Sequence, residues 1–289
     1  TGAIAAGGCI GILIPPSVIL LIYGILTEQS IGKLFAAGII PGVLEAAFYI
    51  VTIWILTKRN PALGPPGPQA TAKEKFSSFL KTWDVIALFL MVIGGLYMGI
   101  FTPTEAAGMG AFGAFCFAIL RGRMDFSKFK HSLTSTILTT GMLFTIVLGA
   151  MILGYFFSVT RLPVEFANYV AALPVNRYVI LLCIVVVYLI LGCLMDSLAI
   201  VLLTVPVFFP LILQLHFDPI WFGIIVTRVT EMGMITPPVG MNVYVIHGIT
   251  KVPMPTIFRG VLPFLAADVC ELVLLIAIPE ISLFLPNMM

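Results

Sequence analysis

Apolar residues form a series of long runs along this chain, and short polar or proline-rich stretches separate them. A run of about 20 apolar residues matches the thickness of the hydrocarbon core of a bilayer. Runs that approach or exceed this length occupy residues 85–100, 106–120, 132–159, 178–210 and 261–285, and each predicts membrane helices. The pattern therefore indicates an all-α polytopic membrane protein.

Two further apolar runs are each interrupted by a Pro-Pro pair, ILIPPSVILLIYG at residues 12–24 and MITPPVGMNVYVIHG at residues 234–248. Proline has no amide hydrogen and pushes the preceding residue out of helical geometry, so a helix is expected to end before each pair. A new helix can begin at once, because proline is tolerated at the first helical position. We therefore predict two re-entrant helical hairpins, the first with arms at 1–14 and 16–26 and the second at 219–249.

The two interrupted runs belong to an internal repeat with an offset of 222 residues. Internal duplication with a broken apolar segment at matching places is typical of secondary transporters. Residues 1–57 are assigned to the end of the first repeat, 58–83 to a cytoplasmic linker with an interfacial helix, and 84–289 to the second repeat, with a broken helix at 178–213. The following pairs share the offset: Pro15 and Pro237, Pro16 and Pro238, Gly38 and Gly260, and Pro41 and Pro263.

Shorter features set the limits of other predicted helices. A segment that begins at Ser30 is expected to break at Pro41 and then continue to Arg59. The Pro/Gly-rich residues 60–72 predict an extended linker. Thr102 to Glu105 spell a capping box with proline at the first helical position, which predicts a helix start.

Composition supports the membrane interpretation and excludes several other classes. The 289 residues are 60% hydrophobic and 10% charged, and the mean hydropathy is +1.14. A net charge of +2, without a basic run interleaved with aromatic residues, gives no support to nucleic-acid binding. The five single cysteines predict packed or lipid-facing thiols, and the GxGxxG spelling at 108–113 follows a capping box rather than a strand.

Candidate chemistry lies at the interruptions of the helices. Unpaired carbonyls at the end of one half-helix suit a bare Na⁺, and unpaired amides at the start of the next suit a carboxylate. The candidate Na⁺ ligands are Gly8, Gly11, Ile14, Gly192, Asp196, Gly233 and Thr236. The candidate substrate-binding residues are Ser17, Thr236, Gly240 and Asn242.

Some of these residues also have a purely structural interpretation. Asp196 could cap a buried helix that begins near Ser197, could hold a cation beside a broken helix, or could do both. Each glycine could simply permit close helix packing. Arg228 and Glu231, three residues apart, are expected to form an ion pair within one helix rather than a catalytic site. Asp268 and Glu271, also three apart, are expected to contact neighbouring helices or water, and Glu45 is similar.

Four blocks of sequence, at 14–42, 99–108, 195–212 and 236–250, resemble the large membrane (M) subunit of TRAP transporters, the tripartite ATP-independent periplasmic family. The resemblance implies an inverted-repeat, elevator-type transporter of the bacterial inner membrane that imports an organic acid, such as a C4-dicarboxylate or sialic acid, together with Na⁺. It also implies two partners, a periplasmic substrate-binding protein and a small four-helix membrane subunit. In the family further helices precede the first Pro-Pro pair, so the chain is expected to be N-terminally incomplete and to lack half of the first cation site.

Three other functions are weighed against this one. A divalent-anion/Na⁺ symporter that works without a binding protein would show the same breaks. An intramembrane enzyme would need paired aspartates, and Asp196 and Asp268, the only midsegment candidates, lack the GxGD context. A purely structural subunit would not need repeated breaks. We therefore expect a subunit of a secondary active transporter and not an enzyme.

Overall fold

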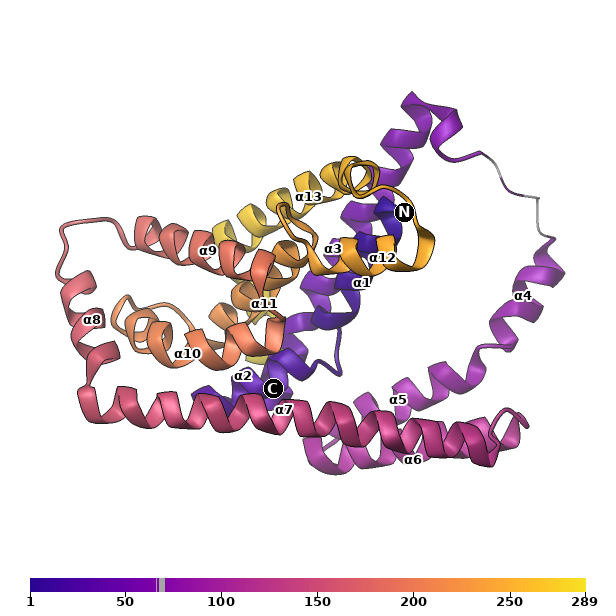
Figure 1. The fold of residues 1–289 in the computed structure, drawn as a ribbon, viewed down its shortest axis with the longest axis horizontal. Helices are drawn as coiled ribbons and strands as arrows, with labels where there is room; N and C mark the ends of the chain where they lie inside the picture. The colour runs from indigo at the N-terminus through magenta and orange to yellow at the C-terminus, as the bar shows by residue number, and fades with distance from the viewer. Residues whose placement is uncertain (66, 68–70) are drawn as a thin grey trace. The chain divides into compact units, whose positions relative to one another are not determined.

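The computed structural model describes residues 1–65, 67 and 71–289, and the regular elements of these residues are all helices (Figure 1). The chain forms two compact units, one made of Thr1–Pro61 with Ile146–Met289 and the other of Ala62–Thr145. Helix α7, Phe126–Thr160, begins in the second unit and ends in the first. The predicted division of the chain into 1–57, 58–83 and 84–289 follows the internal repeat and stays a prediction.

The first unit holds both interrupted runs and the break at Asp196. Its helices are α1 (Gly2–Leu13), α2 (Val18–Thr27), α3 (Ile31–Arg59), α8 (Leu162–Ala171), α9 (Arg177–Leu194), α10 (Ser197–Gln214), α11 (Pro219–Ile235), α12 (Met241–Thr250), α13 (Met254–Ala277) and α14 (Glu280–Leu283), with a 3₁₀ turn η2 (Pro286–Met288). The second unit holds α4 (Ala72–Leu80), α5 (Trp83–Tyr97) and α6 (Pro103–Leu120), and the turn η1 (Pro61–Leu63) lies at the boundary.

Seven segments in the described part of the chain are long and apolar enough to cross a membrane. This finding confirms a polytopic helical membrane protein. The predicted run at 85–100 corresponds to α5, which has 15 residues and is not one of the seven. The seven are Gly2–Thr27, Ile31–Arg59, Pro103–Leu120, Phe126–Thr160, Arg177–Leu194, Ser197–Gln214 and Met254–Ala277.

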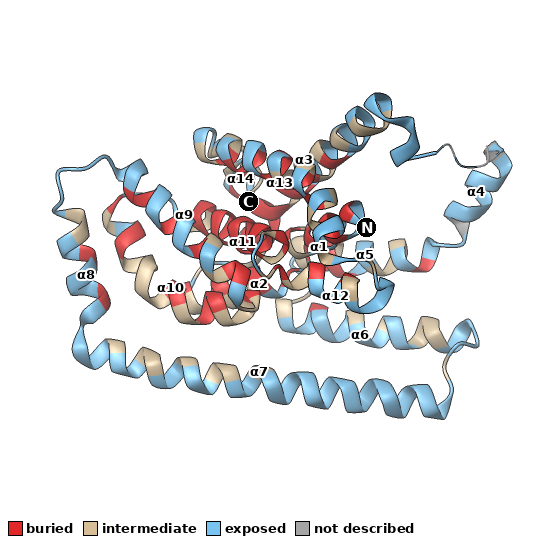
Figure 2. Cartoon of the chain, turned by 45° about the horizontal axis from the view of Figure 1, so that its top comes forward, coloured by how far each residue is buried: buried red, intermediate tan, exposed pale blue. Residues whose placement is uncertain are grey.

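Helix α11 is the centre of the first unit. Every residue from Trp221 to Gly233 is buried, and Figure 2 shows this helix enclosed by its neighbours. The helix packs against α9, α10 and α13, and also against α1, α2 and α3. A helix that is buried on all sides needs apolar residues around its whole circumference or internal partners for its polar ones. Arg228 and Glu231 are therefore the residues of α11 that most need an explanation.

The first Pro-Pro pair interrupts a helix, as predicted, while the re-entrant hairpin expected at this place stays a prediction. α1 ends at Leu13 and α2 begins at Val18, yet the two together form one 26-residue candidate span, Gly2–Thr27. Two prolines remove amide donors and hold their own φ angles, but nothing in this chemistry requires the chain to reverse. The second pair likewise separates α11 from α12.

The predicted break at Pro41 is wrong, because α3 continues from Ile31 to Arg59 with Pro41 inside it. A helix can keep its course around a proline when packing holds both sides. Here Pro41 is buried, and its neighbours Gly38 and Gly42 face the carbonyl oxygen of Leu13 and the side chain of Ile14. α10 and α13 also run through internal prolines.

Two capping boxes start helices in the second unit. The predicted box is confirmed at α6, where the Thr102 amide donates to Glu105 Oε2 at 2.9 Å and the Glu105 amide donates to Thr102 Oγ1 at 3.4 Å. A second box, Thr71 with Glu74, starts α4, the predicted interfacial helix. Hydrogen bonds from Thr71 hold the pKa of Glu74 below its usual value. Residues 66 and 68–70 of the predicted linker lie outside the described residues.

Candidate functional site

Two breaks of the second repeat lie side by side, the one between α9 and α10 and the one between α11 and α12. Gly192 meets Gly233 so closely that a β-carbon on Gly233 would lie 2.5 Å from the Cα of Gly192. Ser197 Oγ lies 2.9 Å from Met234 Sδ. Cys193 Sγ lies 3.5 Å from the carbonyl oxygen of Pro237. The predicted cation ligands Gly192, Asp196, Gly233 and Thr236 therefore occupy one region of the fold.

Asp196 caps α10. Its backbone is extended, with φ −67° and ψ 146°, and its Oδ1 accepts the amide hydrogen of Leu198 at 2.9 Å. This hydrogen bond confirms the structural interpretation of Asp196. The cap uses one carboxylate oxygen, so the cation-binding interpretation is compatible with it and stays a prediction.

The end of α11 keeps oxygen atoms available for a cation. The amide of Thr236 donates to the Gly233 carbonyl at 3.1 Å, and Thr236 Oγ1 donates to the Met232 carbonyl at 2.6 Å. A carbonyl or hydroxyl oxygen has two lone pairs, so each group can still accept another partner. Gly233 and Thr236 thus have the chemistry that a Na⁺ ligand needs.

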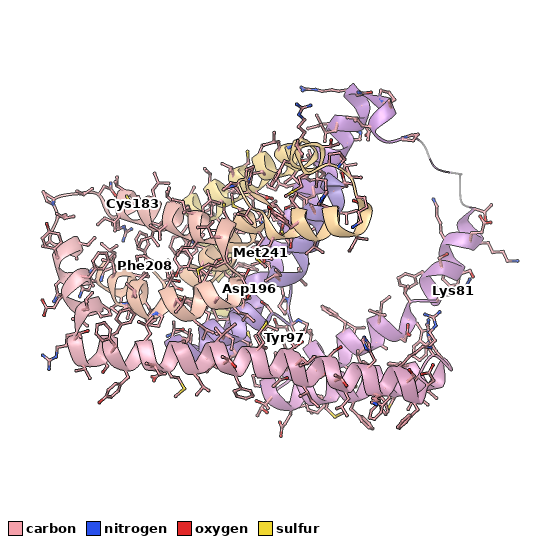
Figure 3. All side chains as sticks on the ribbon, in the orientation of Figure 1. Lys81, Tyr97, Cys183, Asp196, Phe208 and Met241 are labelled. Atoms are coloured by element: carbon pink, nitrogen blue, oxygen red, sulfur yellow. The ribbon has the colours of Figure 1, made fainter. Side chains whose placement is uncertain are left out.

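The start of α12 differs from the other helix starts near the breaks, because no side chain caps it. Gly240 holds φ +60° and ψ 79°, a left-handed conformation that glycine adopts at low cost. Asp196 and Ser17, in contrast, cap α10 and α2 through their side chains. Amides at an uncapped helix start attract anions. Figure 3 labels Asp196 and Met241, which mark the starts of α10 and α12.

Helix α1 meets the start of α12 through Asn242. The side-chain amide of Asn242 donates to Cys9 Sγ at 3.4 Å, and a β-carbon on Gly8 would lie 3.8 Å from the same nitrogen. Cys9 is fully buried, which confirms the packed-thiol interpretation for this cysteine. The place of Cys9 beside Asn242 was not predicted, because a lone cysteine in an apolar run has no sequence pattern that indicates its neighbours.

Three predicted residues at the first break have less support. Ser17 is 3% exposed, and its Oγ accepts the Leu20 amide hydrogen at 3.3 Å, so its observed role is to cap α2. Ile14 is extended and its amide donates to the Ile10 carbonyl at 3.3 Å. A β-carbon on Gly11 would meet no atom within 4 Å. In the described residues no hydrogen bond joins Ser17 to Thr236 or Asn242.

A buried charge cluster lies on α3, α11 and α13. The predicted Arg228–Glu231 pair is confirmed at 3.3 Å, and Asp268, Glu271 and Glu45 make contacts between helices to the same guanidinium. Their convergence on one arginine was not predicted from the sequence. The repeat offset could have indicated that Glu45 and Asp268 belong together. Adding 222 to 45 gives position 267, which is next to Asp268.

A comparison with protein families and with characterised proteins matches the chain over nearly all of its length. The family model described as "Tripartite ATP-independent periplasmic transporter, DctM component" matches residues 1–281. The chain is 36% identical, over 99% of its length and 67% of the relative's, to the C4-dicarboxylate TRAP transporter large permease protein DctM of Pseudomonas aeruginosa. It is 34% identical, over 99% of its length and 67% of the relative's, to the sialic acid TRAP transporter large permease protein SiaM of Vibrio cholerae.

A third relative is the 2,3-diketo-L-gulonate TRAP transporter large permease protein YiaN of Escherichia coli, which is 34% identical over 97% of this chain and 66% of its own length. All three relatives are named as transporter permeases and none as an enzyme. The chain spans about two thirds of the length of these relatives. The family match and the seven apolar segments agree on a multi-pass integral membrane protein. The chain therefore belongs to the DctM family, the large permease subunits of tripartite ATP-independent periplasmic transporters.

Proposed function

We propose that this chain is the large membrane subunit of a Na⁺-coupled secondary transporter that imports an organic acid. The observation that carries the proposal is the contact of Gly192 with Gly233, which joins the break at Asp196 to the break before α12. Broken helices that meet inside a bundle are the usual binding elements of secondary transporters. Family membership supports the same function.

The cation site of the proposal is built from oxygen atoms. Na⁺ is a hard cation, like Ca²⁺ and Mg²⁺, and such ions prefer oxygen ligands. The carbonyls of Gly192 and Gly233, the Thr236 hydroxyl and the Asp196 carboxylate supply them in the second repeat. In the first repeat the proposed carbonyls are those of Gly8 inside α1, Gly11 in its last turn and Ile14 directly after it. No group of three His, Cys, Asp or Glu residues in the described part of the chain is arranged to hold a metal ion, so backbone oxygens carry most of this coordination.

The substrate site of the proposal lies at the start of α12. The uncapped amides after Gly240 suit a carboxylate, and the Asn242 amide and the Thr236 hydroxyl add polar groups next to it. Ser17 completes the set from the first repeat. The relatives are named for a C4-dicarboxylate, sialic acid and 2,3-diketo-L-gulonate, all of which carry a carboxylate. The proposed substrate class is therefore organic acids.

The setting of the proposal is a tripartite system in a bacterial inner membrane. A periplasmic binding protein delivers the substrate, a small four-helix membrane subunit supports the large one, and the site moves across the membrane by an elevator motion. The alternative is a divalent-anion/Na⁺ symporter that needs no binding protein. Uptake that persists when the periplasmic partner is omitted would favour this alternative.

The charge of Asp196 gives the sharpest test of the proposal. Asparagine caps a helix about as well as aspartate, so Asp196→Asn preserves the cap of α10 and removes only the negative charge. We expect Na⁺-driven uptake of a labelled organic acid into proteoliposomes, measured with the complete transporter and its partners, to fall at least about tenfold, which is ~1.4 kcal/mol.

Asp218→Asn is the matched control, because Asp218 caps α11 through the Ile220 and Trp221 amides and has no place in the proposed site. Uptake by the control should equal that of the unmodified transporter. Unchanged uptake by Asp196→Asn, in protein that inserts normally, would remove Asp196 from the mechanism.

A further inference from the structure

Arg228 is surrounded by four carboxyl groups in the interior of the first unit. Its Nη1 lies 2.9 Å from Glu45 Oε1 and 3.3 Å from Glu231 Oε2, and its Nη2 lies 2.5 Å from Asp268 Oδ1 and 3.0 Å from Glu271 Oε2. All five side chains are 0% exposed. Fully ionised, the group would combine four negative charges with one positive charge in a site that water does not reach.

The hydrogen bonds distinguish Glu271 from the other carboxyls. Glu45 and Asp268 each accept a hydrogen bond from the guanidinium, one at each terminal nitrogen. Neither oxygen of Glu271 has an aligned hydrogen-bond partner in the described residues, although Oε2 lies at ion-pair distance from Arg228. A buried carboxylate without hydrogen bonds is strongly disfavoured, and the group takes up a proton instead.

A tyrosine adds an independent polar group to the site. Tyr49 follows Glu45 by one turn of α3, is 4% exposed and stacks edge-on against Phe264 of α13. Its hydroxyl lies close to Glu45 and Asp268 but has no aligned hydrogen-bond partner in the described residues. Glu45 Oε2, Asp268 Oδ2 and the Tyr49 hydroxyl are thus further buried oxygens of this cluster without a hydrogen-bond partner in the described residues.

A metal ion is a poorer match for the surplus negative charge. The carboxyls of Glu45, Asp268 and Glu271 are arranged around a guanidinium, and no three acidic groups of the described chain are placed to hold a metal ion. A proton needs only one carboxyl oxygen and one acceptor. The charge balance and the geometry therefore favour protons.

We propose that Glu271, together with Glu45 and Asp268 around Arg228, forms a proton-binding site that keeps a proton on Glu271 at neutral pH. The site joins α3 to α13, because both helices bind the same arginine of α11, and the predicted repeat makes these two helices equivalent. Proton release from Glu271 adds a negative charge to this junction, so alkaline pH weakens the packing of α13 against α3 and α11. This proposal is independent of the transported substrate.

The other titratable groups near Glu271 lie on α11, α1 and α12. α11 contributes Arg228 and Glu231, and α1 contributes the Cys9 thiol, which lies 3.6 Å from the carbonyl oxygen of Glu231. On α12, His247 interacts with the Val252 carbonyl at 2.7 Å, and Tyr244 is exposed.

Infrared spectroscopy tests the proposal, because a protonated carboxyl has a C=O stretching band apart from those of carboxylates and amides. The full-length protein in lipid at neutral pH should show this band, and the band should disappear at alkaline pH. Glu271→Gln should lose most of it. Glu165→Gln, which changes an exposed carboxyl on α8, should keep all of it.

Two results would overturn the proposal. One is an unmodified protein without a protonated-carboxyl band at neutral pH. The other is a band of unchanged intensity in Glu271→Gln. If Glu271→Gln does not fold, Glu271→Asp decides the question, because it keeps a carboxyl and should shift the frequency of the band; an unshifted band contradicts the proposal. Neither measurement depends on uptake, so failure here is distinct from failure of the proposed function.

Discussion

Single residues without side chains determine how closely the breaks of the second repeat approach each other. Gly192 and Gly233 face each other with backbone against backbone, and a β-carbon on Gly192 would lie 2.9 Å from the Cα of Gly233. Real β-carbons do not come so near to backbone atoms, so a side chain at either position must push the helices apart. The distance between Asp196 and the end of α11 therefore depends on these two glycines.

Gly233→Ala should destabilise the folded protein by about 1–3 kcal/mol, the usual cost of overpacking a close contact. The lowered midpoint of thermal unfolding in detergent measures this effect. Gly149→Ala on α7 is the control, because a β-carbon there meets no atom within 4 Å, and it should leave the midpoint equal or slightly higher. Equal midpoints for Gly233→Ala and Gly149→Ala would contradict the close contact between Gly192 and Gly233.

Substitution of Arg228 should lower the free energy of unfolding more than the other substitutions proposed here. Arg228→Met leaves the surrounding carboxyls without their guanidinium, and breaking a buried ion pair in this way costs about 3–5 kcal/mol. Arg259→Met changes an exposed arginine of α13 and should have little effect. Thermal unfolding of both variants measures the difference. If Arg228→Met lowers the unfolding midpoint no more than Arg259→Met does, the carboxyls do not need the positive charge of Arg228 and the prediction fails.

At the scale of the helix, local chemistry predicted starts and stops well. The helix ends before Pro15 and Pro237 and the capping box at Thr102 follow from proline geometry and hydrogen-bond donors, which act within a few residues. The direction of the chain after each break cannot be predicted in the same way, because proline geometry and capping do not set the direction of the next helix. Pro41 shows the same limit: the contacts of Gly38 and Gly42 with the end of α1 keep α3 continuous.

The capping box of α6 gives a test at this scale. Thr102→Ala removes the oxygen that accepts the Glu105 amide, and loss of such a cap costs about 0.5–2 kcal/mol. Faster hydrogen exchange of the amides in the first turn of α6 measures the effect. Thr104→Ala, two residues further on and also exposed, should exchange like the unmodified protein. Equal exchange in both variants would contradict the role of the cap.

At the scale of the whole molecule, residues that are far apart in the sequence meet in the first unit. Cys9 contacts the backbone of Glu231, 222 residues later, and α3 packs on α13, the helix that the predicted repeat makes its equivalent. The helix breaks were predicted from the sequence, and the structure brings the predicted ligands at two of them together through Gly192 and Gly233, while the internal repeat stays a prediction. The cluster around Arg228 was not predicted, because several helices must first be placed before their charges can be seen to converge.

Na⁺ binding at the breaks is the central claim, and a salt-specific stability measurement tests it most directly. A ligand that binds only the folded state stabilises it, by about 2.7 kcal/mol at a hundred times its Kd. The thermal unfolding midpoint of the full-length protein in detergent should be higher in NaCl than in choline chloride at equal ionic strength, and Asp196→Asn should lose most of this difference. Equal midpoints of the unmodified protein in the two salts would contradict the account.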